Sequence, residues 1–153
     1  MARQLYIQVA TLLLLFVLLY TGLTKWINFN HYSRSMLSQP LPSAWLNVLV
    51  YVIPIIEIIT AILLIPQQTR QLGLWITSIL MISFTAYVWY IKFSSWENTT
   101  CPCGGLFSQL NWNQHAWVNS LLTIITMTAT LLNRNLFPGH GKRRNADASI
   151  QTK

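Results

Sequence analysis

The sequence carries very little charge. Charged residues make up 8% of its 153 residues and hydrophobic residues 53%, whereas a typical soluble domain has roughly 25% charged residues. This balance excludes an ordinary water-soluble globule. The ten Lys and Arg residues still outnumber the three acids and give a net charge of +7. We attribute that excess to membrane topology and to anionic lipid headgroups, and it requires no nucleic-acid partner.

Long apolar runs occupy most of the chain. A helix crosses a bilayer with about 20 mostly apolar residues, and four segments fit, at residues 5–23, 45–65, 72–91 and 116–132. The runs are continuous and do not alternate, which favours helices over a barrel. No small-x-small cleavage site follows the first segment, so we expect it to be retained. The sequence therefore predicts an all-α, integral membrane four-helix bundle with the lipid bilayer as its surroundings.

The basic residues predict the orientation of this bundle. Four spans place both termini on one side, and seven of the ten Lys and Arg residues lie on that side. By the positive-inside rule it is the cytoplasmic side. The seven are Arg3, Arg70, Arg134, Lys142, Arg143, Arg144 and Lys153, and the three on the opposite side are Lys25, Arg34 and Lys92. We expect a multi-pass protein of the cell inner (cytoplasmic) membrane, with a membrane domain at 1–137 and a disordered basic tail at 138–153.

The two outer connections are long, at about residues 25–44 and 92–115, whereas the cytoplasmic loop 66–71 is short. Long loops in compact proteins are often functional. The second outer connection contains both cysteines of the chain, Cys101 and Cys103. We therefore expect the protein to act on its outer face.

The cysteines stand one residue apart in "CPCGG". Cysteines in an oxidising compartment tend to form disulfides, and a bridge between Cys101 and Cys103 closes a small, strained ring that exchanges readily. Pro102 restricts the backbone, while Gly104 and Gly105 leave room for an incoming partner. The pattern favours a thiol–disulfide exchange site on an extracytoplasmic loop.

Two other interpretations of the pair stay open. The first is a structural staple, or two inert thiols in a tight turn. A metal site formed by Cys101, Cys103 and His115 offers only three ligands without a spacing signature, and we expect no metal.

The three acids of the chain are Glu57, Glu97 and Asp147. At about 1.5 Å per residue, Glu57 lies roughly 18 Å from Trp45, near the middle of a ~30 Å hydrocarbon core. An ionisable group at that depth is a functional candidate. Its expected partners are hydroxyl groups of the third and fourth spans, at Ser83, Thr85, Thr123 or Thr126. We expect Lys25 to reach out to water instead.

Two roles fit Glu57. One is an interhelical hydrogen bond that stabilises the bundle, and the other is a proton relay or a polar contact for a quinone head group. His31 and His115 fall on the outer side, where a solvated or capping histidine is common and a proton donor or acceptor near the thiols is the alternative. Asn119 is expected in a helix–helix contact.

Several segments together carry a family resemblance. They are "GLTKW" at 22–26, "IPIIEIITAILLI" at 53–65, "LMISFTAYVWYI" at 80–91 and "CPCGGLFSQLNWNQHAWVNSLL" at 101–122. In this order the chain resembles the MauE branch of the DoxX-like membrane proteins, over about residues 5–132.

The resemblance implies a four-helix membrane protein associated with redox chemistry outside the cytoplasm. Its namesake is similar in role to a maturation factor for the disulfide-rich small subunit of methylamine dehydrogenase. The implied site residues are Cys101, Cys103 and Glu57. Quinone-coupled disulfide generators also use four-helix cores but have two cysteine pairs, and this chain has one. It therefore either passes electrons directly to a quinone, the candidate cofactor, or needs a second protein.

Three functions follow from these observations. The first is a membrane thiol–disulfide oxidoreductase component, with a thioredoxin-like protein or a client protein with exchangeable thiols as partner. The second is a non-enzymatic scaffold or assembly factor with a structural cysteine pair. The third, a transporter or channel, is disfavoured because the sequence shows no internal repeat and no membrane charge cluster beyond Glu57.

Overall fold

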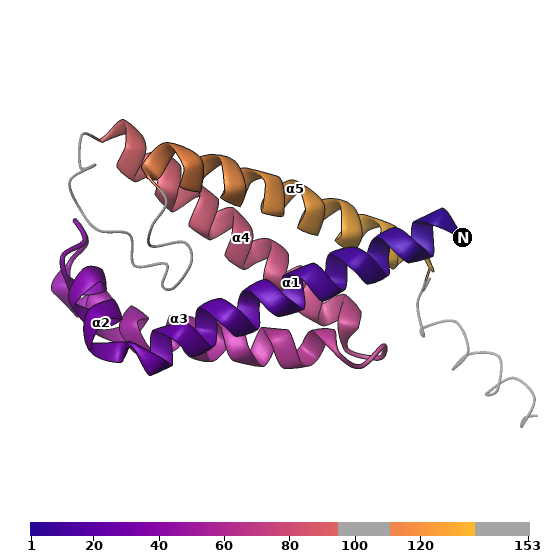
Figure 1. The fold of residues 1–153 in the computed structure, drawn as a ribbon, viewed down its shortest axis with the longest axis horizontal. Coiled ribbons are helices and arrows are strands. Elements are labelled where there is room, and N and C mark those ends of the chain that lie inside the picture. Colours follow the sequence, from indigo (N-terminus) through magenta and orange to yellow (C-terminus); the bar gives the residue numbers. More distant parts are fainter. Residues whose placement is uncertain (95–110, 137–153) are drawn as a thin grey trace, which may run out of the picture.

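The computed structural model describes residues 1–94 and 111–136, with side chains up to Asn133. This part of the chain contains five helices and no strand (Figure 1). They are α1 (Ala2–Ile27), α2 (Phe29–Leu37), α3 (Ser43–Leu64), α4 (Arg70–Phe93) and α5 (Trp112–Leu136). All but α2 are long and apolar enough to cross a membrane. The predicted all-α architecture with four membrane-spanning helices is confirmed.

The helices are longer than most of the predicted spans. α1 covers Ala2–Ile27 against a predicted 5–23, and α5 covers Trp112–Leu136 against 116–132. An apolar run marks only the part of a helix inside the hydrocarbon, whereas the helix continues into its polar flanks. At α5 the start is set by a capping box. The Asn111 side chain accepts a hydrogen bond from the Gln114 backbone N–H at 2.9 Å, and the Gln114 side chain accepts one from Asn111 N–H at 3.2 Å.

Helix α2 is an element that the sequence analysis missed, because it treated residues 25–44 as a long connection. Phe29, Tyr32 and Met36 recur at helical spacing and form one apolar face. Tyr32 and Met36 are buried in a small core with Leu46 and Val50 of α3. The connection between α1 and α3 therefore contains a short helix packed against the start of α3.

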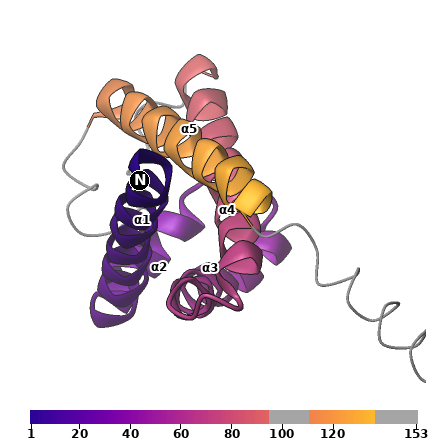
Figure 2. The ribbon, with the colours of Figure 1, turned by 90° about the vertical axis from the view of Figure 1, so that its right-hand side faces the viewer.

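The ends of the helices gather at two ends of the bundle (Figure 1). One end, the α2 end, contains α2, the end of α4 and the start of α5, and the opposite end contains the N-terminus, the α3–α4 turn and the end of α5. From that turn, α3 and α4 diverge towards the α2 end. Figure 2 looks along the bundle and shows the four long helices around a common interior.

Helices α1 and α3 cross closely at Gly22. A Cβ atom at Gly22 would lie 3.0 Å from Ile58 Cγ1 and 3.5 Å from both Glu57 Cβ and the Pro54 carbonyl oxygen. Pro54 lies inside α3 with its side chain buried; a proline within a membrane helix is tolerated where neighbouring helices pack around it. The absence of a side chain at Gly22 is what allows the two helices to approach.

Helices α4 and α5 are joined by a ladder of polar contacts. The hydroxyls of Ser78 and Thr130 are 2.9 Å apart, and those of Thr85 and Thr123 are 2.7 Å apart. Nearer the α2 end, Trp89 Nε1 donates to Ser120 Oγ at 3.2 Å. Hydrogen bonds between hydroxyls replace the hydrophobic driving force that lipid surroundings do not supply.

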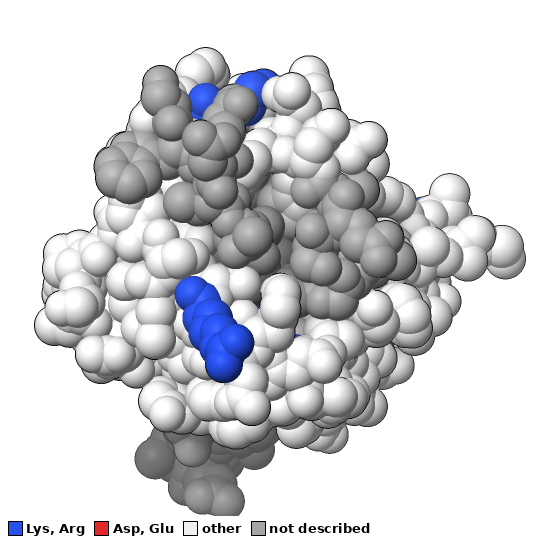
Figure 3. Space-filling view, turned by 60° about the vertical axis from the view of Figure 1, so that its left-hand side comes forward, with Lys and Arg blue, Asp and Glu red and all other residues white. Residues whose placement is uncertain are grey.

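The outer faces of the helices are apolar, as a bilayer requires. On α5, the exposed side chains follow one stripe, at Trp117, Leu121, Ile124, Met127 and Leu131. Figure 3 brings the α2 end forward and shows few basic side chains and, among the described residues, no acidic one. The surface is therefore suited to lipid, and the bilayer is its surroundings.

The close approach at Gly22 generates a stability prediction. We expect Gly22→Val to lower the free energy of unfolding by about 1–3 kcal/mol, because the added carbons overlap Ile58 and the α3 backbone. The matched control is Leu23→Val, since Leu23 is 49% exposed and a surface change costs within about 0.5 kcal/mol. Thermal unfolding of the two purified variants in one detergent checks this. Equal stability of both variants would contradict the tight crossing.

Candidate functional site

A buried ion pair joins α1 to α3. Lys25 Nζ lies 2.5 Å from Glu57 Oε1, and the two residues are only 4% and 1% exposed. Lys25 comes from the last turn of α1, and Glu57 from the middle of α3. The expectation that Lys25 reaches out to water is wrong. So is the expectation that a hydroxyl of the third or fourth span is the partner of Glu57.

Lys25 does not reach water because aromatic side chains of α2 and α4 cover its ammonium group. Helix α2 folds over the end of α1 and places the Tyr32 ring centroid 5.8 Å from Lys25 Nζ. The ring centroid of Phe84, on α4, lies 5.7 Å from the same atom. Both separations are within the range of cation–π attraction. The ammonium is therefore held between two aromatic rings and a carboxylate, away from solvent.

The hydroxyls expected to contact Glu57 have other partners. Thr85 and Thr123 bond to each other. Ser83 donates to the Ile79 carbonyl at 2.9 Å, and Thr126 donates to the Leu122 carbonyl at 2.6 Å. These hydroxyls stabilise α4, α5 and the contact between them.

The second carboxylate oxygen of Glu57 is not satisfied by the ion pair. Among the described residues no hydrogen-bond donor reaches Glu57 Oε2, which is fully buried. A buried acceptor without a donor costs stability and often marks a place where another group binds. The pair therefore contains an unsatisfied acceptor beside a cation.

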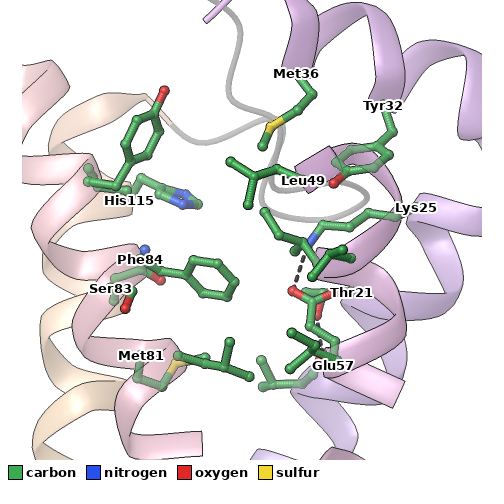
Figure 4. Close-up of a pocket in the computed structure, with 18 of the residues that line it drawn as sticks. Thr21, Lys25, Tyr32, Met36, Leu49, Glu57, Met81, Ser83, Phe84 and His115 are labelled. Carbon is green, nitrogen blue, oxygen red and sulfur yellow. Dashed lines mark hydrogen bonds and ion pairs between the residues drawn. The ribbon is translucent and has the colours of Figure 1, made fainter. Parts of the chain in front are cut away.

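A cavity of about 330 Å³ lies next to this pair. Figure 4 shows it between two walls. His115, Ser83, Phe84 and Met81 come from α4 and α5, and Thr21, Lys25, Tyr32, Met36, Leu49 and Glu57 come from α1, α2 and α3. Phe84 and Leu49 point into the cavity from opposite sides, and the ion pair lies on the wall formed by α1 and α3. The lining is mainly apolar and aromatic, with the polar groups concentrated at a few points.

The predicted histidines differ in their surroundings. His31 is exposed on α2, in agreement with a solvated side chain. His115 is only 2% exposed and lines the cavity from the first turn of α5, so a solvated role for it is wrong. Asn119, one turn further along α5, is 8% exposed and lines the same cavity.

The predicted exchange site, Cys101 and Cys103, lies outside the described residues. In the sequence it stands between Phe93, where α4 ends, and Trp112, where α5 begins. Both of these helix ends are at the α2 end of the bundle.

Sequence reasoning missed Lys25, Tyr32 and Phe84 as site residues. A signal for Lys25 was present, because a lone Lys directly after an apolar span and a lone Glu inside the next span are complementary charges. The residues on α2 and α4 carried no such signal, because aromatic residues occur in all five helices of the described part of the chain.

The family model described as methylamine utilisation protein MauE matches residues 3–132. The chain belongs to this family. The match includes all four long helices, α2 and the segment with both cysteines. No curated protein and no solved structure is detectably similar to the chain.

Membership of the MauE family associates the chain with methylamine utilisation and with the membrane. The segments that carried the resemblance also meet in space. "GLTKW" contributes Gly22 and Lys25, and the segment 53–65 contributes Pro54 and Glu57. These are the residues of the α1–α3 crossing and of the ion pair. Placement in the wider DoxX-like group stays a prediction.

Removing one member of the ion pair tests its energetics. We expect Lys25→Met to lower the free energy of unfolding by about 3–5 kcal/mol, because it leaves the Glu57 carboxylate buried without its cation. The double variant Lys25→Met/Glu57→Leu is expected to recover most of that loss, since apolar residues can replace a buried pair at little cost. Unfolding of both variants in detergent provides the measurement.

The control for lost positive charge is Arg34→Met, because Arg34 is exposed on α2. It should leave stability nearly unchanged. If Lys25→Met behaves like Arg34→Met, or if the double variant is no more stable than Lys25→Met, the ion pair is not the contact that holds α1 to α3.

Proposed function

We propose that this MauE-family chain is a thiol–disulfide component of the cytoplasmic membrane that supports the maturation of extracytoplasmic proteins. Cys101 and Cys103 are its exchange pair, and its partner is a thioredoxin-like protein or a client with exchangeable thiols. Its termini are on the cytoplasmic side and the Cys-Pro-Cys segment is on the other.

The observation that carries this proposal is that the end of α4 and the start of α5, which flank the cysteine segment in the sequence, both line the cavity. The segment with the cysteines begins after α4 and ends at α5, and both Val88 near the end of α4 and His115 in the first turn of α5 line the cavity. The only two thiols of the chain are thus tethered to two helices that line the same cavity as the buried ion pair. A polar intramembrane site joined to a cysteine pair suits a redox component better than a passive anchor.

The exchange itself needs no group beyond the two cysteines and the partner. A partner thiolate attacks one sulfur of the Cys101–Cys103 disulfide and forms a mixed disulfide, and the other cysteine leaves as a thiolate. The second partner thiol then attacks the mixed disulfide. The partner gains a disulfide and the pair becomes a dithiol, so that two electrons and two protons pass from the partner to this chain.

Trapping of the mixed disulfide tests the proposal. We expect a single variant, Cys101→Ser or Cys103→Ser, to accumulate a covalent complex that dissolves on reduction. Its one remaining thiolate attacks the disulfide of an oxidised partner and breaks that bond, and no neighbouring cysteine is left in this chain to displace the partner. Non-reducing electrophoresis of acid-quenched membranes, followed by mass spectrometry of the captured protein, detects it. The matched control is Cys101→Ser/Cys103→Ser, which should insert in the membrane and capture nothing.

Two outcomes would overturn the exchange role. One is that neither single variant captures a protein. The other is that the double variant supports maturation as well as the wild type does. Either result, with normal insertion, would favour a scaffold whose cysteine pair is structural.

Thiol labelling tests the orientation. In intact spheroplasts, a membrane-impermeant maleimide should modify reduced Cys101 and Cys103. The control is Ser149→Cys in the Cys101→Ser/Cys103→Ser background, which should be labelled only after permeabilisation because the basic tail is expected in the cytoplasm. The reverse pattern would place the pair in the reducing cell interior and remove the basis of the proposed exchange.

A further inference from the structure

The cavity has the properties of a ligand site inside the membrane. Its volume of about 330 Å³ falls in the range of small-molecule pockets, which are mostly apolar with a few placed polar groups. Here the polar groups include a buried cation and a buried carboxylate.

The wall formed by α1 and α3 carries a donor and an acceptor side by side. An ammonium has three N–H donors, and the one hydrogen bond that Lys25 Nζ makes among the described residues goes to Glu57 Oε1. Glu57 Oε2, in a residue that is 1% exposed, has no donor in the same part of the chain. Both residues line the cavity, so a ligand oxygen at this wall can accept from Lys25 and, if it carries a proton, donate to Glu57 Oε2 once the carboxylate turns towards it.

We propose that this cavity binds the ring of a membrane quinone. An oxidised quinone oxygen is an acceptor only, and Lys25 supplies the N–H. The same oxygen in the reduced quinol is a hydroxyl, and Glu57 Oε2 accepts its proton in a hydrogen bond. The ring lies between Phe84 and Leu49, which point into the cavity from opposite walls (Figure 4). One constellation thus suits both redox states of the ligand.

The bilayer is the source of this ligand. The lining of the cavity includes Val52 on α3 and Ser83 on α4, which are both exposed, and these two helices diverge towards the α2 end. A ring can enter between these helices with its isoprenoid tail left in the lipid. A phospholipid acyl chain also fits an apolar cavity, but it makes no use of a buried donor and acceptor.

Use of the quinone as an electron acceptor rests on the proposed function. Oxidation of two thiols to a disulfide releases two electrons and two protons, and reduction of a quinone to a quinol consumes two of each. The dithiol left after each exchange is thereby returned to the disulfide. Binding of the quinone itself does not depend on the cysteines.

A cavity-filling variant tests the site. The probe is a short-chain ubiquinone analogue, titrated against the full-length protein in nanodiscs, with a photoreactive azidoquinone to locate the label. We expect Leu49→Trp to weaken binding by more than about tenfold, because the indole occupies the space of the ring. The matched control is Val48→Trp, the next residue of the same helix, which is 55% exposed and should bind within about twofold of wild type.

A second variant keeps the test decisive if Leu49→Trp does not fold. Lys25→Met/Glu57→Leu preserves an apolar cavity but removes the donor and the acceptor. Quinone binding should again fall by about tenfold or more. Native mass spectrometry should show that any lipid retained in the cavity is displaced by the quinone analogue.

Three results would overturn the inference. The first is that the quinone binds Lys25→Met/Glu57→Leu as tightly as wild type. The second is that the azidoquinone labels only lipid-facing residues. The third is that a retained phospholipid resists displacement, which would make an acyl chain the occupant.

The cysteine variant separates this inference from the proposed function. Cys101→Ser/Cys103→Ser should bind the quinone analogue like wild type. Intact quinone binding without any trapped partner rejects only the exchange role. Trapped partner without quinone binding rejects only the quinone site.

Discussion

The ion pair between Lys25 and Glu57 is the interaction on which the arrangement of the site depends. Two opposite charges, 2.5 Å apart, lie in an apolar interior where either one alone would be strongly unfavourable. They can meet only because Gly22 lets α1 approach α3 closely. They stay dry only because α2 lies across the end of α1 and brings Tyr32 over the ammonium. The ion pair between Lys25 and Glu57 therefore depends both on the small residue at Gly22 and on the position of α2.

The bundle has two halves, one formed by α4 and α5 and the other by α1, α2 and α3, and different contacts stabilise each half. Hydroxyl ladders join α4 to α5, whereas close packing and the ion pair join α1 to α3. At the end opposite α2 the halves are tied directly, since Arg3 donates to the Leu132 carbonyl at 2.6 Å and the Tyr6 hydroxyl bonds to that of Thr128. Towards the α2 end α3 and α4 diverge. The cavity is the space left between two halves that are joined at one end.

Much of the fold was predictable from residue types. Continuous apolar runs and scarce charge predict four membrane helices, because no other arrangement satisfies the backbone in lipid. The depth of Glu57 follows from counting along its span. The sequence did not reveal α2, because nine residues between two apolar runs resemble a connection. The complementary charge of Lys25 was visible in the sequence, but its burial was not, and an exposed Lys25 would have left Glu57 to the hydroxyls.

The amino-acid sequence by itself therefore determined the class of the protein, the number of its spans and the presence of one intramembrane acid and one cysteine pair. These properties depend on composition and on local order along the chain. Only the tertiary structure decided the partner of Glu57, the burial of His115 and the existence of a cavity between α3 and α4. Each of these depends on how closely two helices approach and on what covers their ends. Such contacts join residues far apart in the chain, and no local pattern encodes their distance.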